Sequence, residues 1–389
     1  MTRSGIGRFA VHRIACAVTT VEVQRLRDGS LSSMLPGEWP EDMLIGDEGL
    51  GLDSLEQLGA LGALAETFGL DDTSLAEQAP QKVSDWIDWV MAGYETRGCT
   101  ITVKTSGSTG AARPCVHALG TLLNEAAYLA NRFADRKRVI AMVPANHLYG
   151  MIWTAFLPSA LGVPVIARPL GTALELVAGD LVVAVPDQWR AMSRMTRRFP
   201  NDIVGVSSAG MLDDLVAKEL LSAGLGRLID VYGSSETGAI ALRQVPDAMY
   251  ELLPRWNLVP RSDHDWDLSD GGGTLTEMPD LIERAEERWL RPVVRRDGAV
   301  KVAGLNVWPN RVAGVLRRAD GVADVAVRLH VNGRLKAFVV PEAGLEASDL
   351  AFHIDRFVVQ NLKDHERPKS FRFGTVLPRN AMGKLEDWA

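Results

Sequence analysis

The chain has 389 residues, of which 47% are hydrophobic and 23% charged, a composition typical of an ordinary soluble protein with two or three domains. Its net charge of −7 argues against nucleic acid as a partner, so anionic ligands must be bound by local groups. The longest apolar run, residues 151–167, is interrupted by prolines and is too short to span a bilayer. The 3 cysteines lack metal-like spacing and are odd in number, which favours a reducing compartment. We therefore expect a cytoplasmic protein without a membrane span.

The first 97 residues are predicted to form a mostly helical region. Residues 54–68 carry leucines at helical spacing, and a second helix is expected at residues 83–91. Asp53 followed by Glu56 fits a capping box, in which the Asp side chain and the Glu side chain each bind a backbone N–H of the other residue.

A loop rich in glycine and hydroxyl side chains lies between a β-branched run at residues 100–103 and a helical pattern beginning near Gly120. It is predicted to be a strand-to-helix turn that binds phosphate, because glycine lets backbone N–H groups approach anionic oxygens and hydroxyls add donors. It is not a Walker loop, since no G-K-[ST] closes it. An ordinary surface turn is the alternative. The residues are Thr105, Ser106, Gly107, Ser108, Thr109 and Gly110, followed by Arg113.

Strands and helices alternate from residue 100 to about residue 238. Short apolar runs predict strands, and amphipathic segments between them predict helices, which together indicate an α/β layer with a largely parallel sheet. Ligands of such sheets bind at the carboxyl ends of the strands. Polar loops containing His147, Ser207 and Tyr232 follow three of these strands, so we expect them to converge on one rim. The predicted strands are 138–143, 164–168, 180–186, 203–209 and 227–232, and the helices are 120–134, 187–199 and 212–224.

The C-terminal part is predicted to be a compact α+β unit of about ninety residues. Its expected strands are 299–304, 324–331, 335–341 and 370–377, with helices near 309–319 and 347–362. The chain is therefore divided into a helical region at 1–97, an α/β core at 98–296 and a C-terminal domain at 297–389.

Three motifs occur in an order that is specific to one superfamily. Thr105–Gly110 matches T-S-G-[ST]-T-G, Tyr232–Gly238 matches Y-G-x-[ST]-E-T-G, and Pro378–Lys384 matches P-R-[ST]-x-x-G-K. From residue 100 to the end, the chain resembles the adenylate-forming superfamily of acyl-CoA synthetases, adenylation domains and luciferases. It also resembles the shortened aryl-acid ligases of aryl polyene and xanthomonadin-type pathways. The resemblance implies an adenylate-forming core followed by a small, mobile α+β lid domain.

The resemblance also implies an AMP-forming acid–thiol ligase that uses ATP and Mg²⁺ to make an acyl-adenylate and then a thioester. Attack of a carboxylate on the α-phosphorus needs the charges of both partners neutralised and the groups held in line. The roles implied are adenylation for Lys384, Mg²⁺ binding for Glu236, acyl-pocket gating for His147, nucleotide binding for Tyr232, Gly233, Ser234, Thr237, Asp280 and Arg295, and a hinge at Asp297. The alternative for Lys384 is a solvated lysine near the chain end, and the alternative for Glu236 is a solvated loop carboxylate. For His147 the alternative is a histidine buried in the core.

Two departures from the superfamily pattern affect the phosphate loop and the acid pocket. Arg113 stands where the superfamily has lysine, which keeps the positive charge but makes it a planar fork. Only about a hundred residues precede the phosphate loop, where relatives usually have a large subdomain. The pocket is expected to be narrow and to suit a flat aryl acid, such as a hydroxybenzoate, better than a long acyl chain. Its predicted lining is Trp153, Ser207, Ser208 and Gly210.

The segment Gly51–Leu55 resembles the attachment site of acyl carrier proteins, where Ser54 would carry phosphopantetheine. The first helix of a carrier protein is poorly supported, because Gly29 and three serines interrupt its pattern. The alternative is a packing domain in which Ser54 only begins a helix. We therefore expect a carrier protein as acyl acceptor, with free CoA as the alternative. A non-catalytic carrier or scaffold with a decayed ligase core is the third possibility, against which the retained Glu236 and Lys384 argue.

Overall fold

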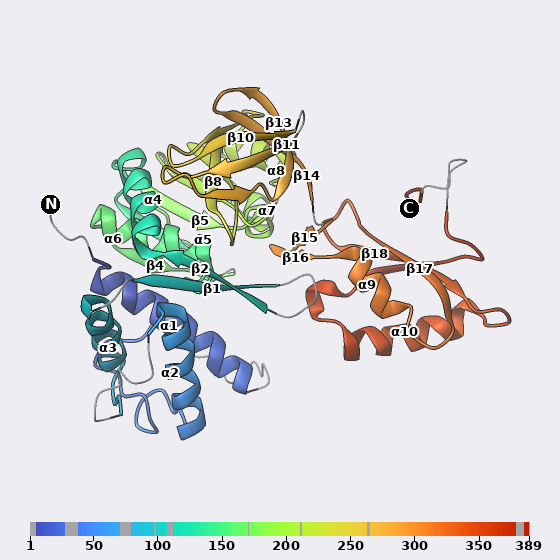
Figure 1. The fold of residues 1–389 in the computed structure, drawn as a ribbon, viewed down its shortest axis with the longest axis horizontal. Coiled ribbons are helices and arrows are strands. Elements are labelled where there is room, and N and C mark those ends of the chain that lie inside the picture. The colour runs from blue at the N-terminus through green and yellow to red at the C-terminus, as the bar shows by residue number, and fades with distance from the viewer. Residues whose placement is uncertain are drawn as a thin grey trace. The chain divides into compact units, whose positions relative to one another are not determined.

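The computed structural model of the protein describes residues 5–27, 38–70, 79–96, 99–106, 112–169, 171–210, 212–262, 265–296, 298–378 and 385–388 (Figure 1). The chain forms two compact units. The first comprises Met1–Thr105, Arg113–Ser208 and Leu212–Leu253, and the second comprises Ser106–Ala112, Ala209–Met211 and Pro254–Ala389. The three-part division at residues 97 and 296 stays a prediction.

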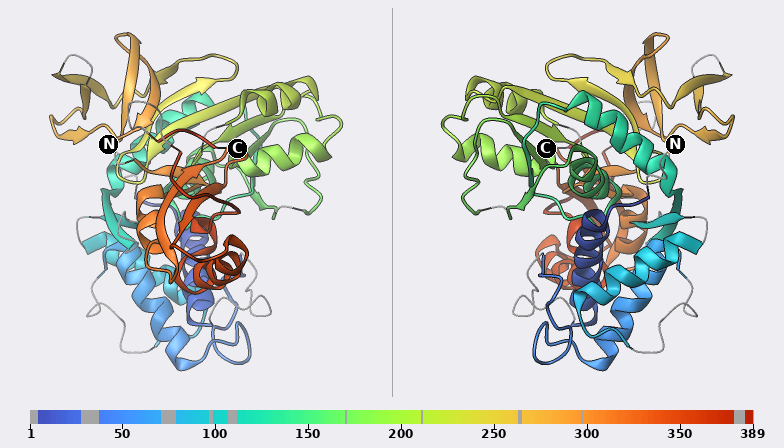
Figure 2. Two further views of the ribbon diagram at one scale, coloured as in Figure 1. Left: turned by 90° about the vertical axis from the view of Figure 1, so that its right-hand side faces the viewer. Right: turned by 90° about the vertical axis from the view of Figure 1, so that its left-hand side faces the viewer.

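The first unit begins with three helices that pack on one another, α1 (Arg8–Leu26), α2 (Ser54–Phe68) and α3 (Val83–Thr96) (Figure 2). The predicted helical character of this region is confirmed, including the capping box of Asp53 and Glu56. Helix α1 was not predicted. Its residues are buried on nearly every side between positions 10 and 19, Arg13 included, so no polar stripe marks it as amphipathic.

The main sheet of the first unit has the strand order β9-β8-β7-β6-β5-β3-β4. Strands β4, β3, β5, β6 and β7 are parallel, which confirms the predicted parallel layer, whereas β8 and β9 continue it antiparallel. The strands are β3 (Arg138–Ala141), β4 (Val165–Ala167), β5 (Asp180–Ala184), β6 (Val204–Ser207), β7 (Arg227–Ser234), β8 (Gly238–Gln244) and β9 (Tyr250–Leu252). The helices are α4 (Leu119–Arg132), α5 (Leu148–Met151), the π-helix η3 (Ile152–Phe156), α6 (Leu157–Leu161), α7 (Pro186–Met195) and α8 (Asp214–Ser222).

The segment around the predicted phosphate loop differs from the prediction. Strand β1 (Thr100–Ser106) is followed by a second strand, β2 (Ala112–Ala118), and the two pair in a two-stranded sheet. Helix α4 begins only at Leu119. The expected strand-to-helix turn is therefore wrong, and the loop connects two strands. The strand signal of β2 is weak because Pro114 is unusual in a strand and because His117 is the only buried side chain among those described for it.

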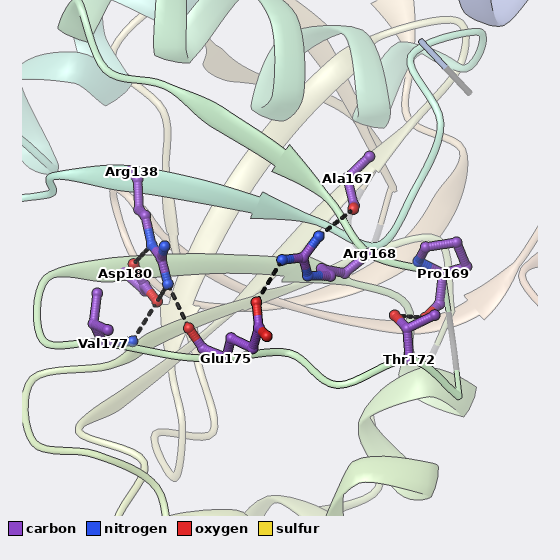
Figure 3. Close-up of polar contacts among 8 residues, drawn as sticks. All are labelled: Arg138, Ala167, Arg168, Pro169, Thr172, Glu175, Val177 and Asp180. Atoms are coloured by element: carbon purple, nitrogen blue, oxygen red, sulfur yellow. Dashed lines mark hydrogen bonds and ion pairs between the residues drawn. The ribbon is translucent and has the colours of Figure 1, made fainter. Parts of the chain in front are cut away.

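The amino ends of β3 and β5 are joined by a buried ion pair (Figure 3). The guanidinium of Arg138 donates from Nε to Asp180 Oδ1 at 2.5 Å and from Nη2 to Oδ2 at 3.0 Å, and the Asp180 side chain is fully buried. Asp180 Oδ2 also accepts from the backbone N–H of Val177 at 2.8 Å, and Glu175 Oε2 accepts from Arg168 at 2.9 Å. These bonds hold the connection from β4 to β5. None of them involves the loops that follow the carboxyl ends of β3, β6 and β7.

The second unit contains two antiparallel regions and a small α+β domain. The strands and helices predicted from residue 300 onward are present, although β19 ends four residues early, and the strand at residues 305–307 and the short helix at residues 364–366 were not predicted. The antiparallel strands between residues 257 and 295 were not predicted, because many of their residues are charged and exposed. The elements are β10 (Asn257–Ser262), β11 (Asp265–Ser269), β12 (Leu275–Glu277), β13 (Asp280–Glu286), β14 (Trp289–Arg295), β15 (Val300–Val302), β16 (Leu305–Val307), α9 (Pro309–Leu316), β17 (Val322–Leu329), β18 (Leu335–Pro341), α10 (Ala347–Asn361), the 3-10 helix η4 (Asp364–Glu366) and β19 (Ser370–Phe373).

Candidate active site

The loops that follow β3, β6 and β7 meet at the carboxyl edge of the main sheet. Tyr149, in the short helix α5 after β3, shares its hydroxyl proton between the carbonyl oxygens of Ala184 and Val206, at 3.1 and 3.0 Å. The hydroxyl of Ser208, directly after β6, donates to the carbonyl of Val231 in β7 at 2.9 Å. Parallel strands end on the same side of a sheet, and these bonds tie the loops after β3 and β6 to it. The predicted convergence of the loops is therefore present in the first unit.

The turn between β7 and β8 is held by hydrogen bonds within itself. A Cβ on Gly233 would lie 2.3 Å from the carbonyl oxygen of Gly238, so only glycine fits there. Ser234 Oγ accepts from the backbone N–H groups of Glu236 and Thr237, at 3.2 and 3.3 Å. The Thr237 hydroxyl is buried and donates to the Gly238 carbonyl at 2.8 Å. Glu236 is exposed on this fixed turn.

The carboxylate of Glu236 is suited to a hard cation that is also held by a bound phosphate. No cluster of three or more His, Cys, Asp or Glu side chains that could hold a metal occurs in the described part of the chain. Mg²⁺ is usually held by one or two carboxylates together with substrate phosphates and water, rather than by a cage of protein ligands. A single exposed carboxylate on a rigid turn fits that requirement.

His117 lies on β2 and contacts the same turn between β7 and β8. Its Nε2 lies 2.7 Å from the carbonyl oxygen of Ser235, the residue before Glu236. A carbonyl only accepts, so Nε2 carries the proton in this bond. The side chain is 8% exposed. Sequence reasoning missed His117, because one buried histidine on a short strand has no motif around it.

A row of polar side chains lies beneath Tyr232. Asp230 on β7 pairs with Arg243 on β8, and Asp230 Oδ2 accepts from Arg243 Nε at 3.0 Å and from the Tyr250 hydroxyl on β9 at 2.6 Å. The ring of Tyr250 meets that of Tyr232 edge to face, with centroids 6.0 Å apart. Burial raises the pKa of Asp230 despite these partners, and burial also raises the pKa of Tyr250. These side chains therefore fix one side of the Tyr232 ring. They come from three strands, and no motif in the sequence indicates that they meet.

Of the predicted acid-pocket residues, His147 and Trp153 follow β3 in the chain, and Ser207 ends β6. His147 is exposed and precedes α5, so it is not a core histidine. Trp153 is 1% exposed and packs in the π-helix between the rings of Phe133 and Tyr149, with centroids 5.4 and 6.4 Å away. Ser207 is fully buried, and within the described residues its Oγ has no hydrogen-bond partner. Their roles, with those of Ser208 and Gly210, stay predictions.

The N-terminal helix α1 supports the π-helix that carries Trp153. Arg13 is 5% exposed, and its Nε donates to the carbonyl oxygen of Thr154 at 2.6 Å. Its guanidinium also pairs with Glu38, and the Thr154 hydroxyl donates to the Gly150 carbonyl at 2.7 Å. A π-helix leaves carbonyls without their usual partners, and π-helical turns are frequent at functional sites. Arg13 thus donates a side-chain hydrogen bond to a carbonyl of the π-helix.

Other predicted site residues belong to the second unit or lie outside the described residues. Asp280 and Arg295 are directly opposite each other across the β13–β14 pair, which explains their spacing of fifteen residues. Arg113 is exposed on β2, and Thr105 and Ser106 end β1. Gly107, Ser108, Thr109, Gly110, Asp297 and Lys384 lie outside the described residues. The predicted roles of all of these residues stay predictions.

Comparison with known proteins shows the family of the chain. The family described as AMP-binding enzyme matches residues 100–261. The 4-coumarate–CoA ligase of Halorhodospira halophila is 36% identical over 94% of this chain and 98% of its own length, and that of Rhodobacter capsulatus is 35% identical over 97% and 100%. The chain belongs to the adenylate-forming superfamily. This adenylate-forming enzyme is an AMP-forming acid–thiol ligase.

Solved structures have the same fold. A double mutant of o-succinylbenzoate CoA synthetase from Bacillus subtilis superimposes with a TM-score of 0.59 at 19% identity, covering 73% of the ligase and 67% of that chain. The 4-coumarate–CoA ligases align over nearly the whole of both chains, so the short region before the phosphate loop is common to them and to this ligase. No helix within the described parts of the ligase is long and apolar enough to cross a membrane.

Proposed function

We propose that this ligase activates 4-coumarate or a closely similar aryl acid with ATP and transfers the acyl group to the thiol of CoA. The observation that carries the proposal is the similarity to two 4-coumarate–CoA ligases along almost the entire chain. A hydroxybenzoate substrate and membership of the aryl polyene subfamily stay predictions, and the names of these two relatives favour 4-coumarate.

Free CoA is a better-supported acceptor than a carrier protein. Ser54 is exposed at the first position of α2, as a modification site would be. However, α2 packs on α1, and α1 is fixed to the π-helix through Arg13. A carrier protein must move in order to deliver its thiol to the active site. Helices that are packed into the first unit cannot easily make such a movement. We infer that the N-terminal helices support the acid-pocket segment and that Ser54 serves α2 as an ordinary helix residue.

The proposed reaction has two steps. In the first, a carboxylate oxygen of the acid attacks the α-phosphorus of ATP, the bond to the β-phosphate oxygen breaks, and pyrophosphate leaves. Mg²⁺, when bound, would neutralise phosphate charge, with Glu236 as its protein ligand and the glycine-rich loop holding the phosphates. In the second step the CoA thiolate attacks the acyl carbon and AMP leaves. Tyr232 would stack on adenine, Lys384 would stabilise the charge in the first step, and His147 would lie at the entrance for the acid.

Pyrophosphate release that depends on both ATP and acid tests the proposal. We expect 4-coumarate and other hydroxycinnamates to give faster release than benzoates or long-chain fatty acids, and CoA to yield the corresponding thioester by mass spectrometry. Release with fatty acids only would contradict the substrate class. An acyl-adenylate that forms but does not react with CoA would contradict the acceptor.

Ser54→Ala distinguishes CoA from an attached pantetheine arm. We expect turnover with free CoA to be unchanged, and incubation with CoA and a phosphopantetheinyl transferase to leave the mass of the parent protein unchanged. A pantetheine mass that appears on the parent and disappears in Ser54→Ala, together with loss of turnover, would restore the carrier interpretation.

A further inference from the structure

Strand β18 of the small α+β domain is buried on both of its faces. Its alternate residues Leu335, Ala337 and Val339 belong to the core under α9 and α10, which lie on one side of the sheet (Figure 1). The residues between them, which include Lys336 and Phe338, point to the opposite face and are buried as well. That face is covered by the last described residues of the chain, 385–388.

Trp388 is the centre of this cover. It is 6% exposed and meets Phe338 edge to face, with ring centroids 5.7 Å apart and planes at 73°. It belongs to one apolar cluster with Ala326, Phe338 and Val340. A buried tryptophan therefore holds residues 385–388 against the sheet.

Residues 385–388, which we call the tail, also make polar contacts with the sheet. Lys336 is 4% exposed, its Nζ lies 2.8 Å from Asp387 Oδ1 and 5.3 Å from the centre of the Trp388 ring, and it donates to the Trp388 carbonyl. Arg328 Nη2 donates to the Leu385 carbonyl at 2.7 Å. A buried ammonium needs such partners, because its desolvation is otherwise costly. The sheet therefore carries two cations whose acceptors come from the tail.

Contacts of the same kind bring together the two ends of the segment between residues 378 and 386. The backbone N–H of Glu386 donates to the Pro378 carbonyl at 2.8 Å, and Leu377 and Leu385 both pack against the Trp388 cluster. Pro378 is the first residue of the C-terminal motif, and Leu385 directly follows its last residue, Lys384. Both ends of the motif are thus attached to one face of β17 and β18, while Lys384 itself lies outside the described residues.

We propose that the contacts of Trp388 and Lys336 with the sheet form a tail anchor, which positions the Lys384 motif for the adenylation step and is dispensable for thioester formation. This inference rests on the proposed role of Lys384 in adenylation. A displacement of a catalytic group by about 1 Å can lower the rate by ~10². If the two ends of the Lys384 motif were no longer held on the sheet, the adenylation step, which needs the lysine, would therefore slow. Trp388 and Lys336 are positioning residues, since neither is placed at the reacting atoms.

Trp388→Ala tests the anchor by separating the half-reactions. We expect pyrophosphate release to slow by ~10- to 100-fold, and thioester formation from supplied acyl-adenylate and CoA to change by less than about threefold. Trp388→Phe keeps an aromatic edge for Phe338 and should recover much of the rate. Lys336→Met, which removes the bonds to Asp387 and to the Trp388 carbonyl but keeps an unbranched apolar stem, should show the same selective loss.

Val358→Ala is the matched control, because Val358 lies in the opposite core under α10 and its loss destabilises the domain without touching the tail. Hydrogen exchange at residues 385–387, measured by mass spectrometry, reports the anchor without any activity. The proposal is overturned if Trp388→Ala exposes these amides but adenylates at the parent rate, or if Val358→Ala gives the same selective loss. Equal loss of both half-reactions also overturns it. A parent protein inactive with every acid would contradict the proposed function, while exchange would still show whether Trp388 holds the tail.

Discussion

His117 connects the strand after the phosphate loop to the turn that presents Glu236. Its buried ring donates to the carbonyl of Ser235, the residue directly before Glu236. A hydrogen bond of this kind contributes about 1 kcal/mol, and here that energy acts on the position of a proposed metal ligand. His117 therefore offers a way to test whether the geometry of this turn matters for nucleotide binding.

His117→Ala should raise the KM for MgATP by about fivefold, because a loss of ~1 kcal/mol corresponds to roughly that factor, while kcat falls less. His117→Gln places an amide N–H near the lost Nε2 and should restore much of the affinity. Steady-state pyrophosphate release at varied MgATP measures both constants. An unchanged KM in His117→Ala, with a folded protein, would show that the bond does not position the turn.

Lys384 carries the strongest prediction at the residue scale. As a cation beside the charge that develops during adenylation, its loss in Lys384→Ala should slow pyrophosphate release by ~10² or more. Thioester formation from supplied acyl-adenylate should change far less, because the lysine is not needed once the adenylate exists. Single-turnover assays of the two half-reactions check this. Pyrophosphate release at the parent rate would show that the lysine has no such role.

Helices α1 and α2 are joined at their ends by one ion pair. Arg27, directly after α1, donates through Nη2 to Glu56 Oε2 at 2.8 Å and through Nε to Oε1, and Glu56 also accepts from the Asp53 N–H at 3.0 Å. The bond from Arg27 lowers the pKa of Glu56 below its ordinary value of 4.5. Because the carboxylate is favoured in the folded state, its stabilisation is present above the ordinary pKa and is lost as the pH falls through the lowered one.

Glu56→Gln keeps the capping geometry but removes the charge, so it should reduce the free energy of unfolding by about 1 kcal/mol at pH 7. The difference from the parent should shrink as the pH is lowered below the ordinary pKa of Glu56. Urea unfolding at several pH values measures this. Glu66→Gln on the same helix is the control, because Glu66 pairs with Lys104 at 2.6 Å where both side chains are about half exposed. A pH-independent difference for Glu56→Gln would contradict the assignment of the effect to the ion pair.

The whole molecule is proposed to use its small α+β domain differently in the two half-reactions. The chain enters this domain through Arg296, whose guanidinium binds the Met278 carbonyl at 2.8 Å and Asp265 at 2.9 Å, and through Gly298, which has a φ of 68°. These residues flank Asp297, the predicted hinge. Arg296 is thus held by side-chain bonds, whereas Gly298 has a backbone conformation that favours glycine.

Asp297→Pro should fix φ at the hinge and restrict the domain to a subset of orientations. We expect one half-reaction to lose much more activity than the other. Pyrophosphate release and thioester formation from supplied acyl-adenylate, each measured in a single turnover, make the comparison. Asp297→Ala is the matched control, because it removes the carboxylate without restricting φ. Equal losses in a folded Asp297→Pro protein would argue against rotation about this residue.

The sequence by itself determined the elements whose signals are local. The parallel strands of the core appear as short apolar runs between amphipathic helices, and the C-terminal domain follows the same periodicities, because burial on one or both faces dictates the side chains of each strand. The turn at Gly233 and the capping box at Asp53 are also local, since both depend on residues a few positions apart. The three motifs indicated the superfamily for the same reason: each keeps its chemistry within one short loop.

Only the tertiary structure decided which distant residues support those loops. Helix α1 has no polar face because Arg13 is buried against the π-helix, and β2 became a strand because β1 pairs with it. The bond of His117 to Ser235 and the cover of β18 by Trp388 join residues far apart in the chain. A sequence pattern records whether a side chain prefers burial, but the partner that buries it is chosen by packing, which no periodicity encodes.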